Sequence, residues 1–443
     1  MVIIDPEIKK LLHSCSAMNA IRMVTGSFHV FFLFSMGVSI SEIAILQMVF
    51  SISIFVFELP TGILGDKLGV KQNVILSCFF YALFFPLCTF APNMYLLIIA
   101  EICYALGACF CSGADSTWIK GLVDRLPGES RESNIYHHYM SYVREVNALM
   151  NSVSGVIGVI IVVLIGSYSA AYYLCGASFI FLVFAFSKID SVSEKKDVQN
   201  IKERFNVYLH TKSALQLLVS TKVGIYYILI CGLVVAAMQP VFHFWQPFIL
   251  NQTGLLNNAT KNQEIVILGG CFFSYSFTKY LFNRYFRKAL LTRYNPMKIT
   301  LLATVFAAAS MLALILINGQ WLPIVIFTMF HSFFSVPMSQ FDSEFFKHLN
   351  NNNSNTVLSI VSLLARVFGI VSLLIIGVMA ESLPLSSAFV FSFICILSVI
   401  PVTIAWIRYI DKNEENKENK ENKENKENKE NKENKDGITG VAE

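Results

Sequence analysis

The chain has 443 residues, of which 55% are hydrophobic and only 14% are charged. A soluble protein carries about 25% charged residues, so this composition excludes a soluble globular class and predicts that most of the chain lies in lipid. The formal net charge of +4 says little about partners, and we expect no nucleic acid among them.

The ten cysteines all fall inside apolar runs. No Cys/His spacing fits a disulfide framework or a zinc site, so we interpret the cysteines as small packing residues and expect no metal and no cofactor. The apolar run that follows Lys9 and Lys10 is too long for a cleaved signal peptide and has no small-residue cleavage site.

Twelve apolar segments follow in chain order, each near or above the ~20 residues that cross a ~30 Å hydrocarbon core. They lie at about 13–37, 41–64, 73–91, 94–118, 138–165, 168–187, 223–249, 264–283, 298–318, 321–345, 355–379 and 384–407. We therefore predict an all-α membrane protein with twelve transmembrane helices. A charged cytoplasmic linker at 188–222 divides it into two six-helix halves, at 1–187 and 223–408.

Basic residues indicate on which side of the membrane each loop lies. If the N-terminus is cytoplasmic, the outer loops carry only Lys261, whereas the inner loops carry Lys67, Lys71, Lys120, Arg125, Arg131, Arg284, Arg287, Lys288, Arg293, Lys298 and Lys347. We expect a multi-pass protein of the cytoplasmic (inner) membrane with both termini in the cytoplasm. The Glu-Asn-Lys repeat within 409–443 has no apolar face to bury, which predicts a disordered tail.

A short polar string separates the second and third apolar segments. The second segment ends at Glu58 and Pro60, and Gly62, Gly65 and Gly69 follow within a few residues. These glycines permit close packing and positive φ angles, so the string predicts a tight turn between two membrane helices. Its acid, Asp66, can cap a neighbouring helix N-terminus.

This string resembles the Gly-x-Leu-x-Asp-Arg-x-Gly-Arg-Lys signature of the major facilitator superfamily, with Val70 where the family usually has a base. The preceding Glu-Leu-Pro-Thr-Gly is similar to that of a large bacterial branch. Further matches lie at 37–43, 112–115, 245–248 and 356–359, so the resemblance covers about residues 10–408. It implies two pseudo-symmetric halves that rock around a central site. We further expect a cytoplasmic gate, with Asp66 near the N-terminus of the eleventh helix, formed by Gly62, Asp66, Lys67, Gly69 and Lys71.

Polar residues share one face in the first, fourth, seventh and tenth helices. An ionisable side chain inside a spanning helix costs on the order of 3 kcal/mol, so these faces predict a central polar cavity. The period of three helices agrees with the nested repeats of the family that the signature resembles. The substrate-binding candidates, which also include one residue of the eleventh helix, are Asn19, Arg22, His29, Gln239, His243, Gln246, His331 and Arg366.

The acids of the fourth helix, Glu101 and Asp115, are the candidates for proton coupling. Each candidate has an alternative interpretation. Asp115 can pair with Arg144 or with the signature loop, and the histidines can be packing residues. We expect Glu58 to pair with the bases of the loop.

Two arginines reach mid-membrane depth, Arg22 in the first half and Arg366 in the second. Each must pair with an acid, a carbonyl or a bound anion. A carboxylate-bearing solute would complete the pairing through charge-assisted hydrogen bonds. The competing interpretation is that Arg366 pairs with Asp342 or Glu344 and locks the tenth and eleventh helices together.

These features favour a secondary transporter over an enzyme, because no phosphate loop, nucleophile–base pair or metal cluster is present. We expect a monomer without catalytic residues, whose partners are a small organic solute, protons and the lipid bilayer. An anion such as a siderophore or another organic acid is the leading solute. The alternatives are a drug/proton antiporter, which the missing Gly-Pro-rich motif in the fifth helix disfavours, and a transporter-like membrane sensor.

Overall fold

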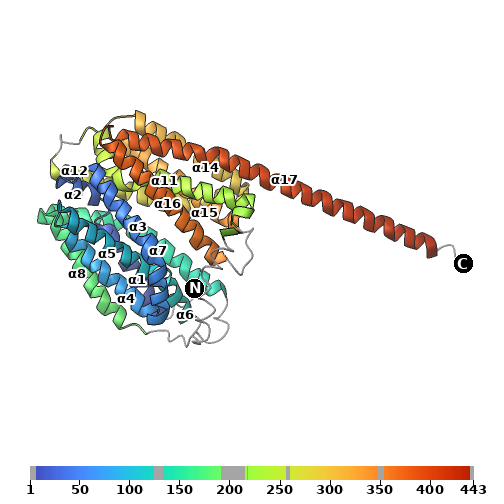
Figure 1. Cartoon of the computed structure of the whole chain (residues 1–443), viewed down its shortest axis with the longest axis horizontal. Helices are drawn as coiled ribbons and strands as arrows, with labels where there is room; N and C mark the ends of the chain where they lie inside the picture. The colour runs from blue at the N-terminus through green and yellow to red at the C-terminus, as the bar shows by residue number, and fades with distance from the viewer. Residues whose placement is uncertain are drawn as a thin grey trace.

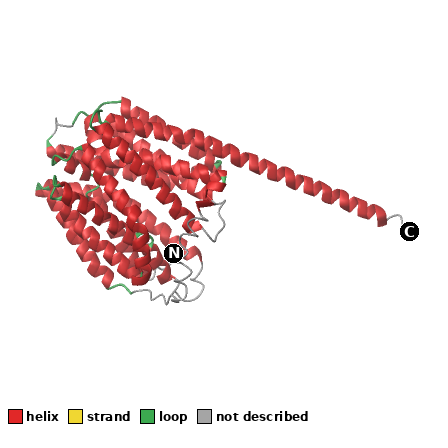
Figure 2. Ribbon diagram, in the orientation of Figure 1, coloured by secondary structure: helices red, strands yellow, loops and turns green. Residues whose placement is uncertain are grey.

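The computed structural model describes residues 6–123, 133–190, 215–216, 218–255, 260–346 and 354–439. The described residues are helical apart from short turns, and they contain twelve helices or helix pairs long and apolar enough to cross a membrane (Figure 2). This confirms the prediction of an all-α membrane protein with twelve transmembrane segments.

The first half holds six spans. Its helices are α1 (Pro6–Val24), α2 (His29–Ser35), α3 (Ile40–Leu68), α4 (Val70–Cys88), α5 (Met94–Cys111), α6 (Ala114–Val123), α7 (Ser133–Ile165) and α8 (Tyr168–Ser187). The second half holds the other six. Its helices are α11 (Lys222–Gln252), α12 (Lys261–Leu281), α13 (Lys288–Arg293), α14 (Pro296–Leu316), α15 (Leu322–Phe346), α16 (Ser354–Ala380) and α17 (Ser386–Thr439), with a π-helical turn at Phe282–Arg287.

The two halves pack against each other mainly along two pairs of helices, α3 with α16 and α7 with α12, and α11 also contacts α2 and α3 (Figure 1). We call the end of the bundle that holds Pro6, Gly69 and Lys222 the basic end. The opposite end, which holds the turns after Ser35, Cys88 and Gln252, is the far end.

One span is broken, and one further predicted helix is divided. The first span is interrupted by turns at Thr25–Phe28, between α1 and α2, and Ser112 and Gly113 separate α6 from the fourth span, which ends at Cys111 on α5. The sequence predicts continuous helices in both places. Gly113 has a φ of +73°, a value that glycine adopts without strain, and it turns the chain there.

The signature string differs from the predicted turn, because α3 continues through Pro60 as far as Leu68. The hydroxyl of Thr61 donates to the carbonyls of Phe57 and Glu58 and supports the turn around the proline. The chain reverses at one residue, Gly69, whose φ is +91°. A Cβ atom at Gly65 would meet the side-chain amide of Asn73, so a glycine there lets α4 approach closely without displacing that side chain.

The tail also differs from the prediction. The structure continues α17 through the Glu-Asn-Lys repeat to Thr439, as a single helix that projects beyond the bundle (Figure 1). The first part of α17 is anchored in the bundle, so the repeat extends an existing helix and avoids the cost of nucleating one.

Candidate substrate site between the two halves

The break in the first span is bridged by a side chain from the other half. The amide oxygen of Gln246, on α11, accepts a hydrogen bond of 2.6 Å from the backbone N–H of Phe31 in α2. Its amide nitrogen donates a hydrogen bond of 2.9 Å to the carbonyl of Gly26, in the break itself. Gln246 is buried, so it satisfies backbone groups that the interruption leaves without helical partners.

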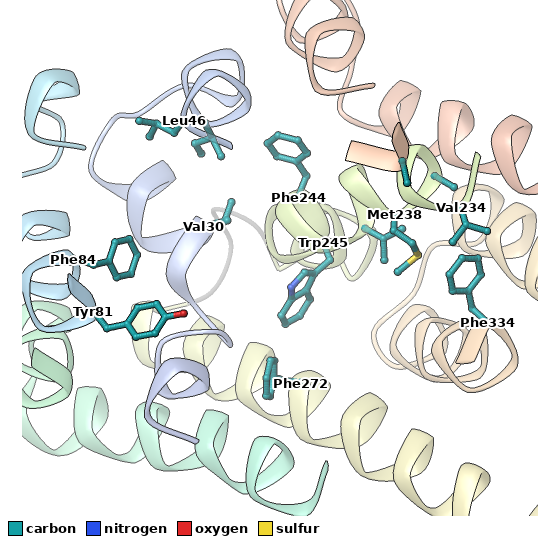
Figure 3. Packing of buried hydrophobic residues seen from close by; sticks show 14 of the residues in the cluster. Val30, Leu46, Tyr81, Phe84, Val234, Met238, Phe244, Trp245, Phe272 and Phe334 are labelled. Carbon is teal, nitrogen blue, oxygen red and sulfur yellow. The ribbon is translucent and has the colours of Figure 1, made fainter. Parts of the chain in front are cut away.

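A second contact across the halves lies beside this bridge. The Phe272 ring, on α12, fills a notch that two glycines of the first half leave open. A Cβ atom at Gly155 would lie 2.4 Å from a carbon of this ring, and one at Gly26 would lie 3.4 Å from it. The rings of Phe272 and Trp245 are 6.4 Å apart and point towards each other (Figure 3).

Two further close approaches between the halves involve small residues. Gly269 of α12 faces Val159 of α7, and Gly377 of α16 faces Ala44 of α3. Together with Gln246, these residues lie in the parts of their helices nearest to the far end. The two halves are therefore packed together at the far end.

Arg22 lies in an aromatic surrounding within the first half. Its guanidinium donates hydrogen bonds of 3.3 and 3.2 Å to the hydroxyl of Tyr104. It also lies over the rings of Tyr81 and Tyr104, 4.8 and 5.3 Å from their centroids. Among the described residues no carboxylate comes within 4.0 Å of this charge, so neutral groups alone contact Arg22 in the protein.

The other candidates of the first and seventh helices make contacts of different kinds. Asn19 donates to the carbonyl of Cys15 in its own helix, and Gln239 donates to that of Val235. His29 is hydrogen-bonded at 2.8 Å to the hydroxyl of Tyr172. His29 and His243 lie within electrostatic reach of each other across the halves. The structure thus brings together His29 with His243, and Gln246 with the break in the first span.

His331 lies in an aromatic cluster of the second half. Its ring stacks on Tyr275 with 4.3 Å between centroids, and it meets the Phe327 ring edge to face with 4.6 Å between centroids. Lys279 of α12 is exposed and within electrostatic reach of His331. Sequence reasoning missed Lys279 as a site residue. Its position four residues after Tyr275, on the same helical face, is the signal that could have revealed it.

Arg366 lies on α16 where this helix faces the first half. Its Nε atom is buried without a hydrogen-bond partner, and so is the Oε2 atom of Glu58 on α3. Both charges lie within electrostatic reach of the thiol of Cys109 on α5. The suggested partner Asp342 instead accepts a hydrogen bond of 2.7 Å from Tyr227. Among the described residues Arg366 forms no ion pair within 4.0 Å, so its expected pairing with Asp342 or Glu344 is absent from the structure.

The proton-coupling candidates occupy separate places. Glu101 is 5% exposed, and its carboxylate accepts a hydrogen bond of 3.4 Å from Gln47 within the first half. Asp115 lies at the start of α6, within electrostatic reach of Cys15 and Cys111. The side chain of Arg144 lies outside the described part, so the pairing of Asp115 with Arg144 stays a prediction.

The expected gate is described in part. Lys71 donates hydrogen bonds of 2.7 Å to the carbonyls of Ser187 and Ile189, and so caps the end of α8 within the same half. Lys67 is exposed, and a Cβ atom at Gly62 would meet no atom within 4 Å. The side chain of Asp66 lies outside the described part, so its contact with the eleventh helix stays a prediction.

Clusters of histidine, cysteine and acidic residues that could hold a metal ion are absent from the described part of the chain. The described contacts instead bring hydrogen-bonding groups of the two halves together, at Gln246 and at the pair His29 and His243. Such an arrangement can bind a small polar solute, and it changes when the halves move relative to each other.

A curated relative and two solved structures resemble the chain. It is 25% identical over 262 residues to an uncharacterized MFS-type transporter, YxaM, of Bacillus subtilis (strain 168). That match spans 54% of the chain and 58% of the relative, so the chain aligns with little more than half of the relative's length. The crystal structures of the nucleoside transporter NupG and of a mutant form of NupG both superpose with a TM-score of 0.69 at 11% identity. The mutant covers 89% and the unmutated protein 91% of this chain, and 99% of each solved chain is matched.

These structures share the fold at an identity too low to carry function. The family assignment rests on a longer match, because the family model of the Major Facilitator Superfamily aligns with residues 11–352. This range includes most of both halves, and it agrees with the resemblance of the signature string and with the expectation of a transporter rather than an enzyme. The chain belongs to the Major Facilitator Superfamily.

Proposed function

We propose that the protein is a secondary active transporter that moves a small organic anion across the cytoplasmic membrane by alternating access, coupled to protons. The observation that carries the proposal is the state of its two intramembrane arginines. Arg22 is held by a tyrosine hydroxyl and two aromatic rings, and Arg366 has an unpartnered Nε atom. A cation in a membrane interior is costly unless an anion or a polar group compensates for it.

A bound anion offers that compensation. The planar guanidinium of arginine presents N–H groups in a fork that matches both oxygens of a carboxylate. Lys279 adds a third cation on the side of the second half. The nearby aromatic rings of Tyr81, Tyr104 and Tyr275 favour a solute that joins its carboxylate to an apolar or aromatic body.

The packing supports an assignment of the conformational state. If the basic end faces the cytoplasm, as the distribution of lysine and arginine predicts, the Gln246 bridge and the Phe272 contact close the outer side. The structure then corresponds to an inward-facing state. Transport requires these contacts to separate in the alternate, outward-facing state.

The test is uptake by the full-length protein in proteoliposomes with an imposed pH gradient. The panel comprises radiolabelled monocarboxylates, an iron-loaded carboxylate siderophore, a nucleoside and an organic cation. We expect gradient-dependent accumulation of a carboxylate, absent from protein-free vesicles and abolished by a protonophore. Accumulation of the nucleoside or the cation without any carboxylate would contradict the proposal.

A further inference from the structure

The contact between α3 and α16 brings together two charges that the contacts described so far leave without partners. The methyl group of Ala44 lies 3.5 Å from the position of a Cβ atom at Gly377. This contact fixes the register of two neighbouring helices that cross the membrane in opposite directions. Arg366 precedes Gly377 by eleven residues, so it lies level with Phe55 on α3. Glu58 is three residues further along, an axial offset of about 4.5 Å.

The immediate surroundings of the two groups agree with this register. Cys109 of α5 is within electrostatic reach of both Glu58 and Arg366, and its thiol contacts the carbonyl of Ile54, one helical turn before Glu58. The two charges are further apart than the 4.0 Å of a direct ion pair. Oε2 of Glu58 and Nε of Arg366 remain buried and unpartnered.

These two groups differ in how they can respond to burial. An arginine stays charged at any pH that a protein meets. A carboxylate that loses its counter-charge can take up a proton and become neutral. From the described parts of the elements packed against α3, Cys109 on α5 is within electrostatic reach of Glu58, and Arg366 on α16 is within reach of the same thiol. Of this pair, only the carboxylate can gain or lose a proton.

We propose that Glu58 is the proton-coupling residue and that Arg366 is shared between Glu58 and the solute. In the empty site the carboxylate of Glu58 balances the charge of Arg366. When a solute carboxylate binds the guanidinium, Glu58 takes up one proton. The solute and the proton are then released together on the opposite side of the membrane. Each cycle moves one monovalent anion with one proton, so its net charge movement is zero. This inference rests on the proposed function and replaces Glu101 as the coupling group.

A double-mutant cycle in detergent tests the pair without any solute. The melting temperature Tm is measured from pH 5 to pH 8 for the wild type, E58Q, R366Q, E58Q/R366Q and R366K. At pH 8 we expect the double variant to be at least as stable as R366Q alone, because the second substitution removes the unbalanced carboxylate. R366K should keep the wild-type pH dependence, and E58Q should lose part of it.

The matched control is E101Q, which alters a buried carboxylate of the same half whose partner is the neutral Gln47. The effects of E101Q and R366Q should add, because these residues share no partner. Additive effects of E58Q and R366Q, or an unchanged pH dependence in E58Q, would overturn the pairing. This result would stand even if no anion were transported, so it is separable from a failure of the proposed function.

A transport experiment then tests coupling, with the carboxylate that the uptake panel identifies. E58Q should lower both the accumulation driven by a pH gradient and the exchange of anion measured without a pH gradient. The fold-loss of accumulation should be at least ten times the fold-loss of exchange. Wild-type accumulation should not change when a potassium diffusion potential is imposed with valinomycin. Equal losses of accumulation and exchange in E58Q, or uptake of a monovalent anion that follows the membrane potential, would overturn the coupling role.

Discussion

Gln246 and Phe31 are joined by a hydrogen bond of 2.6 Å that connects the two halves at the far end of the bundle. The same amide also donates to Gly26, so one side chain supports both sides of the break in the first span. A closure made of two hydrogen bonds can be broken and reformed during transport, because the net contribution of each bond is only about 0.5–1.5 kcal/mol.

We predict that Gln246→Ala loosens this closure. The buried N–H of Phe31 and the carbonyl of Gly26 lose their partner, at a cost of about 1–3 kcal/mol for each unsatisfied group. Hydrogen–deuterium exchange of the peptide that contains Phe31 should become faster than in the wild type. The matched control is Gln252→Ala, which removes an amide that donates to Leu314 and Ile315 within the second half. Equal protection of Phe31 in the wild type and Gln246→Ala would contradict the bridge.

The notch that receives Phe272 gives a second prediction. Gly155→Ala places a methyl group against the Phe272 ring, and overpacking of this kind costs about 1–3 kcal/mol. We expect Gly155→Ala to lower the Tm. The double variant with Phe272→Ala should recover part of this loss of Tm. Gly270→Ala is the control, because a Cβ atom there would meet nothing within 4 Å. If Gly155→Ala proved as well tolerated as Gly270→Ala, the notch would have no role in closure.

The twelve spans could be predicted from the sequence because runs of apolar residues record the thickness of the membrane directly. The role of Gln246 could not be predicted, because its partners are backbone atoms that the break at Thr25–Phe28 leaves available. The polar stripe placed Gln246 at the interface between the halves, but a stripe cannot distinguish a bridge from a ligand. Similarly, Arg22 was predicted to need a partner, and Tyr104 lies 82 positions away in the sequence.

Local rules also failed at two elements. Pro60 and the neighbouring glycines predicted a turn, whereas Thr61 supports a helix that extends to Leu68. The register between α3 and α16, which brings Glu58 towards Arg366, depends on the Ala44–Gly377 contact between segments more than 300 positions apart. No periodicity within one helix records such a contact.

Truncation tests how far the tail contributes to the bundle. A chain that ends at Asn413 lacks the part of α17 that projects beyond the other helices (Figure 1). We expect its Tm in detergent to equal that of the full chain within error, since a helix without packing partners adds no tertiary contacts. A chain that ends at Ala388 removes most of the twelfth span and provides the comparison. A large fall in Tm on truncation at Asn413 would show a contact between the tail and the bundle.

The most direct test of anion recognition by the two arginines is the affinity of the transported carboxylate for the variants Arg22→Lys and Arg366→Lys. Each variant keeps the positive charge and loses the planar fork. The competitive inhibition constant against uptake, measured together with Tm, should rise about tenfold, corresponding to about 1.4 kcal/mol, while Tm stays near that of the wild type. An unchanged constant in both variants, or a transported solute that proves to be a cation, would contradict the account.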